Sequence, residues 1–532
     1  MSRASGKRKK RFLTVVFIGI AVFLTAGLVF FMPVIWNAAR YAFSSPAEYY
    51  RYVEEKAAGK RISGFCQWYA EIVERCSFTE HRREESTLCL ETGEEFWEFI
   101  GTTFLGTAAG KEASGIKEIG LDFSAAAEQD GVRAMLSGAL SLNQLRVLDT
   151  AVFLDLQQDS VYAWIPEFSG ECPAIAIEEL IGLDSGEIKE FLALLQQFCK
   201  AMPKEGELKR LLKRYASLAL SCAEEAESGK KMVRAGNVIK ECTEVTVTFD
   251  GAAVRNVLET LLEEIAADQK LEALVMEVLE VQEGENAKEK YQWFLGKVLE
   301  LSGHLEGLDE IGEVKMTVWV NQRGEIIGRR FLFGDKSEFS YIALVDGKKI
   351  GCKLTLNAGK LRLSLEGGGA RKREMYSGKF EFHVMGLRVA ELLVTDFNLK
   401  DWRDGYLNAS ATISPSGMLK TLLKKAVGNG LFPEQPKLIL SIAEDKKGRE
   451  IKTVFQNGEE LFAALTYRQT ERTGERVAVP EKEQLVLLED RAAFFGWLEE
   501  TEKGKLLEKL EEAGVSSVWI RAISNRFLPE PE

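Results

Sequence analysis

In the first long hydrophobic stretch of the chain, polar residues do not alternate with apolar ones at a regular period. Phe12 to Trp36 include no charged residue, and 21 uncharged residues of this stretch precede Pro33. As a helix rising about 1.5 Å per residue they extend about 32 Å, close to the ~30 Å hydrocarbon core of a bilayer. The stretch therefore predicts a transmembrane helix with its ends at Phe12 and Trp36.

The residues before this stretch predict its orientation. Arg3 and the run Lys7 to Arg11 are basic, and no acidic residue occurs before Glu48. Such a cluster remains cytoplasmic, so the body of the chain is expected outside the cytoplasm. The alternative is a cleaved signal peptide, whose apolar core is usually only ~7–15 residues long. The nearest imitation of a cleavage site is Ala42-Phe43-Ser44, so we favour an uncleaved signal-anchor.

Helical signals follow the predicted anchor. Ser45-Pro46-Ala47-Glu48 combines an N-cap serine, a proline at N1 and a glutamate at N3, which together form a capping box. The helix it starts is expected to end at Gly59, and a second helical piece is expected to reach about Cys76. We interpret these two pieces as a neck between membrane and body.

The remaining pattern changes between a period of two and a period of three to four. Consecutive strands are predicted between Gly115 and Pro166, and a strand over Glu241–Phe249. Asp250 is expected to cap a helix with an apolar stripe. Further helices are predicted at Ser185–Ala201, Glu205–Glu227, Met418–Val427 and Asp490–Ala513, the last ending at Gly514.

From Val314 to Tyr467 turn signals recur about every ten residues between strand-like runs, which predicts a long antiparallel meander. These predicted hairpin turns are Asn321–Gly324, Asp346-Gly347, Asn357–Gly359 and Gly367–Gly369. The order of strands, helices, many strands and a final helix predicts an α+β fold, in which antiparallel meanders pack on amphipathic helices. We divide the chain into a basic tail (1–11), the anchor (12–36), a membrane-proximal α+β region (37–236) and a region of helices and meander (237–532).

Charge excludes one class of partner. The chain has 69 basic and 81 acidic residues, and without the six basic residues of the tail the balance is 63 to 81. A net charge of −18 outside the membrane leaves no basic surplus to neutralise phosphates, so we expect no nucleic-acid partner. The apolar content of 46% is ample for a packed core.

The chain has eight cysteines, all after the predicted anchor. Cys66 and Cys76 are expected on one helix, where ten residues separate their Cα atoms by ~15 Å, too far for a disulfide. Cys222 and Cys242 flank a short connection and are a candidate disulfide. The alternative, buried thiols in a packed core, is open for most of the cysteines. Since the sequence has no C-x₂₋₄-C pair, we predict no metal site.

No catalytic constellation stands out, so we predict no catalytic residues, no cofactor and no enzyme. Gly367–Arg373 combines glycines with cations, but it lies between predicted strands and fits a hairpin better than a phosphate loop. Two S-x-x-K matches, at Ser114 and Ser228, lack their companion motifs. An enzyme would require His81, His304 or His383, or a buried carboxylate, to lie beside a nucleophile in a cleft.

Several segments carry a resemblance. SPAEYYRYVEEK, VYAWIPEFSG, CTEVTVTFDGAAVRNVLETLLEEI, VWVNQRGEIIGR and LEEAGV, with the anchor, resemble uncharacterised membrane-anchored extracytoplasmic proteins of Firmicutes. VWVNQRGEIIGR is also similar, more distantly, to a strand–turn–strand of the LolA-like lipoprotein-carrier class. That resemblance implies a curved antiparallel sheet wrapped on helices around an apolar cavity. It implies no catalytic residues.

Two functional hypotheses remain. The first is a non-catalytic binding module, tethered to the cell membrane, that holds an apolar or lipid-like ligand between sheet and helices. It predicts an apolar cavity of several hundred Å³. The second is a cell-envelope scaffold that acts through an exposed apolar patch or an unpaired sheet edge, with a protein partner that the sequence does not identify.

Overall fold

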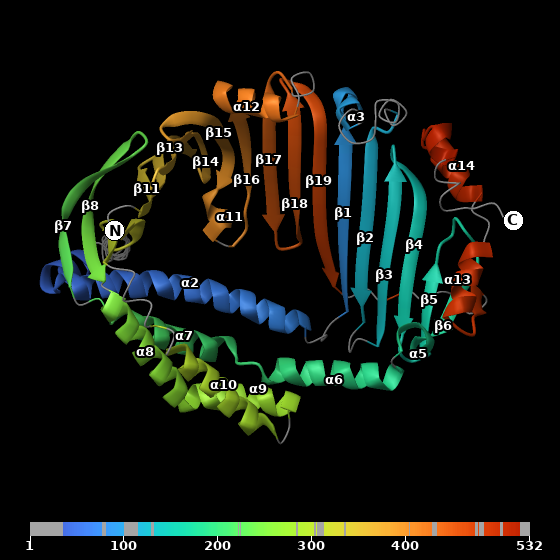
Figure 1. Cartoon of the computed structure of the whole chain (residues 1–532), viewed down its shortest axis with the longest axis horizontal. Coiled ribbons are helices and arrows are strands. Elements are labelled where there is room, and N and C mark those ends of the chain that lie inside the picture. The colour runs from blue at the N-terminus through green and yellow to red at the C-terminus, as the bar shows by residue number, and fades with distance from the viewer. Residues whose placement is uncertain are drawn as a thin grey trace, which may run out of the picture. The chain divides into compact units, whose positions relative to one another are not determined.

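Antiparallel strand pairs dominate the computed structural model of the chain, which has the predicted α+β fold class (Figure 1). The structure describes residues 36–76, 81–100, 115–128, 132–182, 184–221, 223, 225–249, 251–283, 286–302, 305, 313–334, 337–403, 405–427, 433–473, 477, 484–500 and 504–521. Two compact units can be distinguished, and each combines segments that are far apart in the sequence. The first unit contains Met1–Cys66, Glu205–Leu271 and Gln292–Gly368; the second contains Gln67–Lys204, Glu272–Tyr291 and Gly369–Glu532.

The first unit is built on a six-stranded antiparallel ladder in the order β7-β8-β9-β10-β11-β12. Its strands are β7 (Ala226–Ala235), β8 (Val238–Phe249), β9 (Val314–Val320), β10 (Ile326–Phe333), β11 (Ser337–Asp346) and β12 (Lys349–Ala358). Its helices include the first part of α2 (Pro46–Cys76), with α7 (Glu205–Leu220) and α8 (Gly251–Ala267). Helices α9 (Gln269–Glu283) and α10 (Ala287–Ser302) are divided between the units.

Helix α2 is part of the core of the first unit. The predicted capping box is present, since the Ser45 amide donates to Glu48 at 2.8 Å and the Glu48 amide donates to Ser45 Oγ at 3.3 Å. Tyr49, Tyr50 and Val53 are fully buried, and they pack on valines of β8 and β9: Val245, Val247, Val318 and Val320. The prediction of a neck is therefore wrong for this part of the helix, because its apolar side chains fill a core.

A buried ion pair joins the same helix to β10. Arg329 donates to both carboxylate oxygens of Glu54, with Nη2 at 2.8 Å from Oε2, and each side chain is only 9% exposed. Burial alone lowers the pKa of Arg329, but the contact with Glu54 raises it, and the net shift is upward. The raised pKa keeps Arg329 charged in a place where it would be poorly solvated without Glu54.

The second unit contains a longer ladder, in the order β14-β15-β16-β17-β18-β19-β1-β2-β3-β4-β5-β6-β20 (Figure 1). Its pairs are antiparallel except β6 with β20. Strand β1 (Arg82–Thr92) joins the two halves of the ladder, because it pairs with β19 (Glu460–Thr473) on one side and with β2 (Glu118–Ala127) on the other. The other strands are β3 (Arg133–Leu142), β4 (Leu145–Asp155), β5 (Ser160–Trp164), β6 (Cys172–Ala176), β14 (Met375–Val384), β15 (Leu387–Asn398), β16 (Ala409–Pro415), β17 (Pro436–Asp445), β18 (Gly448–Asn457) and β20 (Leu485–Leu487).

Short helices cover the ends of this ladder. Helix α14 packs on β4 through Leu510, which joins Leu142 and Val147 in one buried cluster. Helix α6 begins at a complete capping box on Asp184, and its Ile188 and Leu192 pack on a cluster around Leu156. The helices of this unit are α3 (Glu94–Ile100), α5 (Ile177–Ile181), α6 (Ser185–Ala201), α11 (Leu399–Arg403), α12 (Gly417–Val427), α13 (Arg491–Glu500) and α14 (Gly504–Glu512).

Three local predictions are wrong. Helix α2 continues through Gly59, because a single glycine costs only about 1 kcal/mol in a helix that is held by packing. The helix expected to reach Glu227 ends at Leu220, and Ala226–Ala235 forms the edge strand β7. The triple glycine is not a turn but lies within β13 (Leu361–Lys372), and a Cβ at Gly369 would meet the Ser377 carbonyl oxygen at 2.0 Å.

Candidate functional site

One face of the second unit's ladder carries large hydrophobic side chains that remain exposed to solvent. Residues directly paired across neighbouring strands point to the same face. The pairings put Ala125, Leu136 and Val152 on one face of β2, β3 and β4. By the same pairing rule, this face continues over β1, β19 and β18 to β17 and β16. We call it the apolar face and define it by Phe123, Leu136, Val152, Ile413, Leu438 and Leu465.

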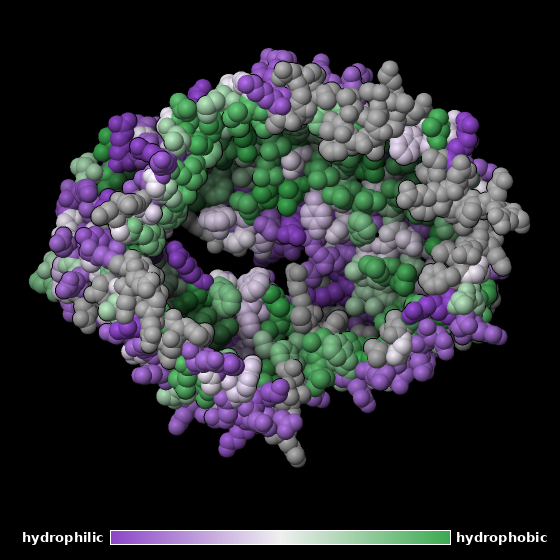
Figure 2. All heavy atoms as spheres, viewed as in Figure 1, coloured by the Kyte–Doolittle hydropathy of each residue, from purple (hydrophilic) through white to green (hydrophobic). Residues whose placement is uncertain are grey.

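The exposure of the apolar face is unusual for a sheet. Its six defining side chains are between 38% and 61% exposed, with Leu136 the most exposed. Figure 2 shows hydrophobic residues gathered along the strands of this ladder. The opposite face is different: on β16 and β18, Thr412 and Lys452 alternate with apolar-face residues. Because large contiguous apolar patches on folded proteins are commonly sites of interaction, the apolar face is a candidate functional site.

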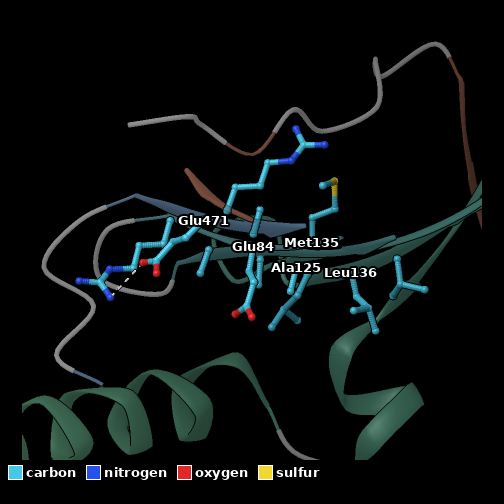
Figure 3. Close-up of a pocket in the computed structure, with 12 residues that line it drawn as sticks. Glu84, Ala125, Met135, Leu136 and Glu471 are labelled. Carbon is cyan, nitrogen blue, oxygen red and sulfur yellow. Dashed lines mark ion pairs between the residues drawn. The ribbon is translucent and has the colours of Figure 1, made fainter. Parts of the chain in front are cut away.

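A pocket of about 450 Å³ lies at one end of β1, β2, β3, β4 and β19, and most of its lining residues are on the apolar face. Arg83, Ala126 and Met135 line it from the opposite face of the same strands. Leu136 and Met135 project to opposite sides of β3, with Leu136 on the same side as Glu84 (Figure 3). The apolar part of the lining consists of Ala125, Ala126, Ala127, Ala134, Met135, Leu136, Val152 and Leu154. The alanines leave room between the larger side chains, so the space is wide enough for a branched or unbranched hydrocarbon group.

Charged residues form the rim of the pocket, and they are paired. Arg82 lies 3.5 Å from Glu471, an ion pair drawn as the dashed line in Figure 3. Glu84 accepts a hydrogen bond from Gln469. Arg83 is on the opposite face, where its Nε lies 3.0 Å from Glu85. The pocket is thus amphipathic, with an aliphatic interior and a polar border of both charges.

The predicted anchor lies outside the described residues except at its outer end. Phe12 falls in the part that the structure does not describe, and Trp36 begins a helical segment over residues 36–43. Trp36 is 53% exposed, and the Arg40 guanidinium lies 5.5 Å from its ring centroid. Within the described ranges, no helix has the length and apolar content needed to cross a bilayer. The transmembrane prediction therefore stays a prediction.

The cysteines are placed mainly in strands and helices of the core. Cys66 lies in α2, which ends at Cys76, so the prediction that they share one helix is confirmed. Cys242 is buried in β8 beside Trp319 and Leu344. Cys222 lies outside the described residues, so its pairing with Cys242 stays a prediction.

The histidines and the candidate metal ligands are dispersed. His383 is on β14, with Nε2 at 3.7 Å from Glu381, whereas His81 directly precedes β1 and His304 lies outside the described residues. Among the residues that the structure does describe, no group of three or more His, Cys, Asp or Glu is placed to hold a metal ion.

Cys172 is a measurable marker of core integrity beside the pocket-forming strands. It is fully buried in β6, its thiol donates to the Ala163 carbonyl at 3.1 Å, and burial raises its pKa to about 11. Because the thiolate is the reactive form, we expect iodoacetamide to leave Cys172 unmodified near pH ~8.5 in the folded chain and to modify it in urea, as read by peptide mass spectrometry.

The raised pKa of Cys172 also makes the stability of the fold depend on pH. A thiol whose pKa is higher in the folded chain stabilises the fold below its unfolded value of ~8.5, and this contribution is lost as pH rises towards about 11. Labelling of Cys172 in the folded chain near neutral pH, as fast as in urea, would contradict the buried environment.

The pocket is not predicted from the sequence because β1, one of its strands, is not predicted. RREESTLCLET begins with four charged residues, which reads as a solvated loop, and only Leu88 and Leu90 carry a period of two. The run Ala125–Ala127 was part of a predicted strand, but alanines give no sign of facing a cavity. The signal that could have revealed β1 is the alternation of Leu88 and Leu90 with less hydrophobic residues in its C-terminal half, directly after a strongly polar N-terminal half.

In comparisons with known proteins, the chain matches no protein-family model, no curated protein and no solved structure.

Proposed function

We propose that this chain is a non-catalytic binding module, tethered to the cell membrane by its N-terminal helix, that holds an apolar or lipid-like ligand outside the cytoplasm. The observation that carries this proposal is the pocket on the apolar face, with its aliphatic interior and polar rim. Its volume of about 450 Å³ lies in the range of ligand pockets, ~300–1,000 Å³.

The energetics favour a hydrocarbon ligand. Each buried CH₂ group contributes about 0.8 kcal/mol, so a chain of modest length laid on Leu136 and Val152 gains several kcal/mol. Both partners lose hydrated apolar surface, because these two side chains are 61% and 42% exposed without a ligand. The paired charges of Arg82 and Glu471 suit a polar head group at the border, where it keeps contact with water.

Photo-crosslinking tests this proposal on the full-length chain in the membranes of the expressing cell. Benzoylphenylalanine replaces Leu136, and radiolabelled phospholipid serves as the probe. We expect a lipid adduct after irradiation, and none when the same group replaces Ser137, which points to the opposite face. Equal labelling at the two positions, or none at either, would overturn the proposal.

Leu136→Glu is the corresponding loss-of-binding variant. A carboxylate on the wall of the pocket must lose water when hydrocarbon covers it, at a cost of roughly 1–3 kcal/mol or more. We therefore expect the affinity for a fluorescent fatty acid to fall by roughly fivefold to a hundredfold or more, since 1.4 kcal/mol corresponds to tenfold. Ser137→Glu is the matched control and should retain the affinity of the unmodified chain.

The alternative function is a cell-envelope scaffold, which the same exposed face also favours. It predicts that a protein, not a lipid, covers Leu136. A protein adduct at this position, with no lipid adduct, would support the scaffold and reject the ligand-binding module.

A further inference from the structure

The apolar face extends far beyond the pocket. Leu90 on β1 pairs with Leu465 on β19, which continues this row through Thr453 and Leu440 to Ala411 on β16. A second row runs from Leu438 through Ile413 and Leu392 to Phe380 on β14. On the other side of β1, Leu88 pairs with Leu121, which pairs with Leu140. Leu140 in turn pairs with Leu148 on β4, and Leu438 pairs with Phe455 on β18. Each strand from β4 to β14 therefore has an apolar side chain on this face, and Thr453 is a polar position within the first row.

Charged side chains on this face gather at one border. Besides Arg82, Glu84 and Glu471 at the pocket, this border contains Glu444, the last but one residue of β17, and Arg449, the second residue of β18. The pairing register places all of these residues along the same edge of the ladder, where antiparallel strands begin and end alternately. Arg449 lies over the Tyr467 ring at 5.6 Å from its centroid. The face therefore has a polar border along one side and an aliphatic interior beside it.

The length of these rows of apolar side chains determines how many acyl chains they can hold. Ten strands from β14 to β4 are separated by nine intervals, and at about 4.8 Å each the rows extend about 43 Å measured along the sheet. One acyl chain occupies about half of the ~30 Å hydrocarbon core of a bilayer, or ~15 Å. The rows are therefore long enough for two or three chains end to end.

The chemistry of the rows favours lipid over protein. Protein interfaces contain about one hydrogen bond per 100–200 Å². Between Leu90 and Phe380 the rows offer the Thr453 hydroxyl among aliphatic and aromatic groups, and the backbone donors and acceptors of these strands are used in the ladder. An acyl chain requires no hydrogen bonds, and its head group finds partners at the polar border.

We propose that the apolar face is a continuous lipid track, on which acyl chains of more than one phospholipid lie across the strands from β4 to β14. This inference rests on the proposed function, because it extends the ligand from the pocket over the neighbouring strands. The chains lie perpendicular to the strands, and the head groups lie along the border from Arg82 to Arg449.

The test places the crosslinking group far from the pocket, in the full-length chain in membranes with radiolabelled phospholipid. Ile413 on β16 and Leu438 on β17 are directly paired and both 38% exposed. The control is Thr412, which points to the opposite face. We expect phospholipid adducts with the crosslinking group at Ile413 or Leu438, and no adduct with the group at Thr412. If one of the two variants does not accumulate, the other carries the test.

The outcomes separate the two proposals. Adducts at Leu136 but not at Ile413 or Leu438 overturn the track and leave the pocket as the binding site. No adduct at any of these positions overturns the proposed function itself. Lipid phosphorus extracted from the purified chain gives a second readout: more than one phospholipid per chain supports the track, and a single one contradicts it.

Discussion

Glu54→Ala is expected to lower the free energy of unfolding of the first unit by about 3–5 kcal/mol, because it leaves a buried guanidinium without its partner. Arg329 is held by two hydrogen bonds to Glu54, and both side chains are 9% exposed. Urea unfolding of the full-length chain, followed by hydrogen exchange of the β8 and β10 peptides, measures the loss.

An exposed ion pair from the same helix is the matched control. Lys60 lies 3.3 Å from Glu325, and the two side chains are 70% and 44% exposed. Lys60→Ala should cost only about 0–1 kcal/mol, as is typical of surface pairs. The double variant Glu54→Ala with Arg329→Met should recover most of the stability, since it removes the uncompensated charge. A single Glu54→Ala variant as stable as Lys60→Ala would refute the role of the ion pair.

Tyr50→Ala is expected to cost a comparable amount, about 3–5 kcal/mol, the range for large aromatic truncations in a core. Tyr50 of α2 is fully buried against the valines of β8 and β9, and its hydroxyl lies 3.9 Å from Met316 Sδ. The same variant distinguishes a core helix from a neck, in which this residue would face solvent. Protection of the β8 and β9 amides against hydrogen exchange is the readout.

Phe43→Ala controls for the removal of an aromatic ring close by in the sequence. Phe43 is 90% exposed, so its loss should change stability by no more than about 0.5 kcal/mol. A loss for Tyr50→Ala that does not exceed that for Phe43→Ala would restore the interpretation of this segment as a neck.

Local signals in the sequence were sufficient for many elements. Ser185–Ala201 is predicted from its amphipathic pattern and is observed with the same bounds, and in the structure Asp184 and Glu187 form a capping box at its start. The turns at Gly324, Gly347 and Gly359 all have the positive φ that such residues permit. In these cases a few neighbouring residues determine the structure by themselves.

The errors arise where the deciding partner is distant. A glycine run permits a turn, but it also permits two backbones to approach closely, and only the position of Ser377 shows that Gly369 does the second. Similarly, Tyr49 and Tyr50 lie in a segment that, from its sequence, is interpreted as a neck, and only the placement of β8 and β9 against them shows that they belong to a core. The pocket depends on the alignment of β1 with β2 and β19, which no local pattern encodes.

The pairing of Arg82 on β1 with Thr473 on β19 has a consequence for synthesis. At ~5–20 residues per second, a ribosome needs roughly 20–80 s to make the chain between them. During that time β1 has a ladder partner only on its β2 side, and its other edge presents open backbone groups to any strand nearby. Completion of this unit therefore waits until late in synthesis, and the unpaired edge of β1 is where misfolding of the growing chain would begin.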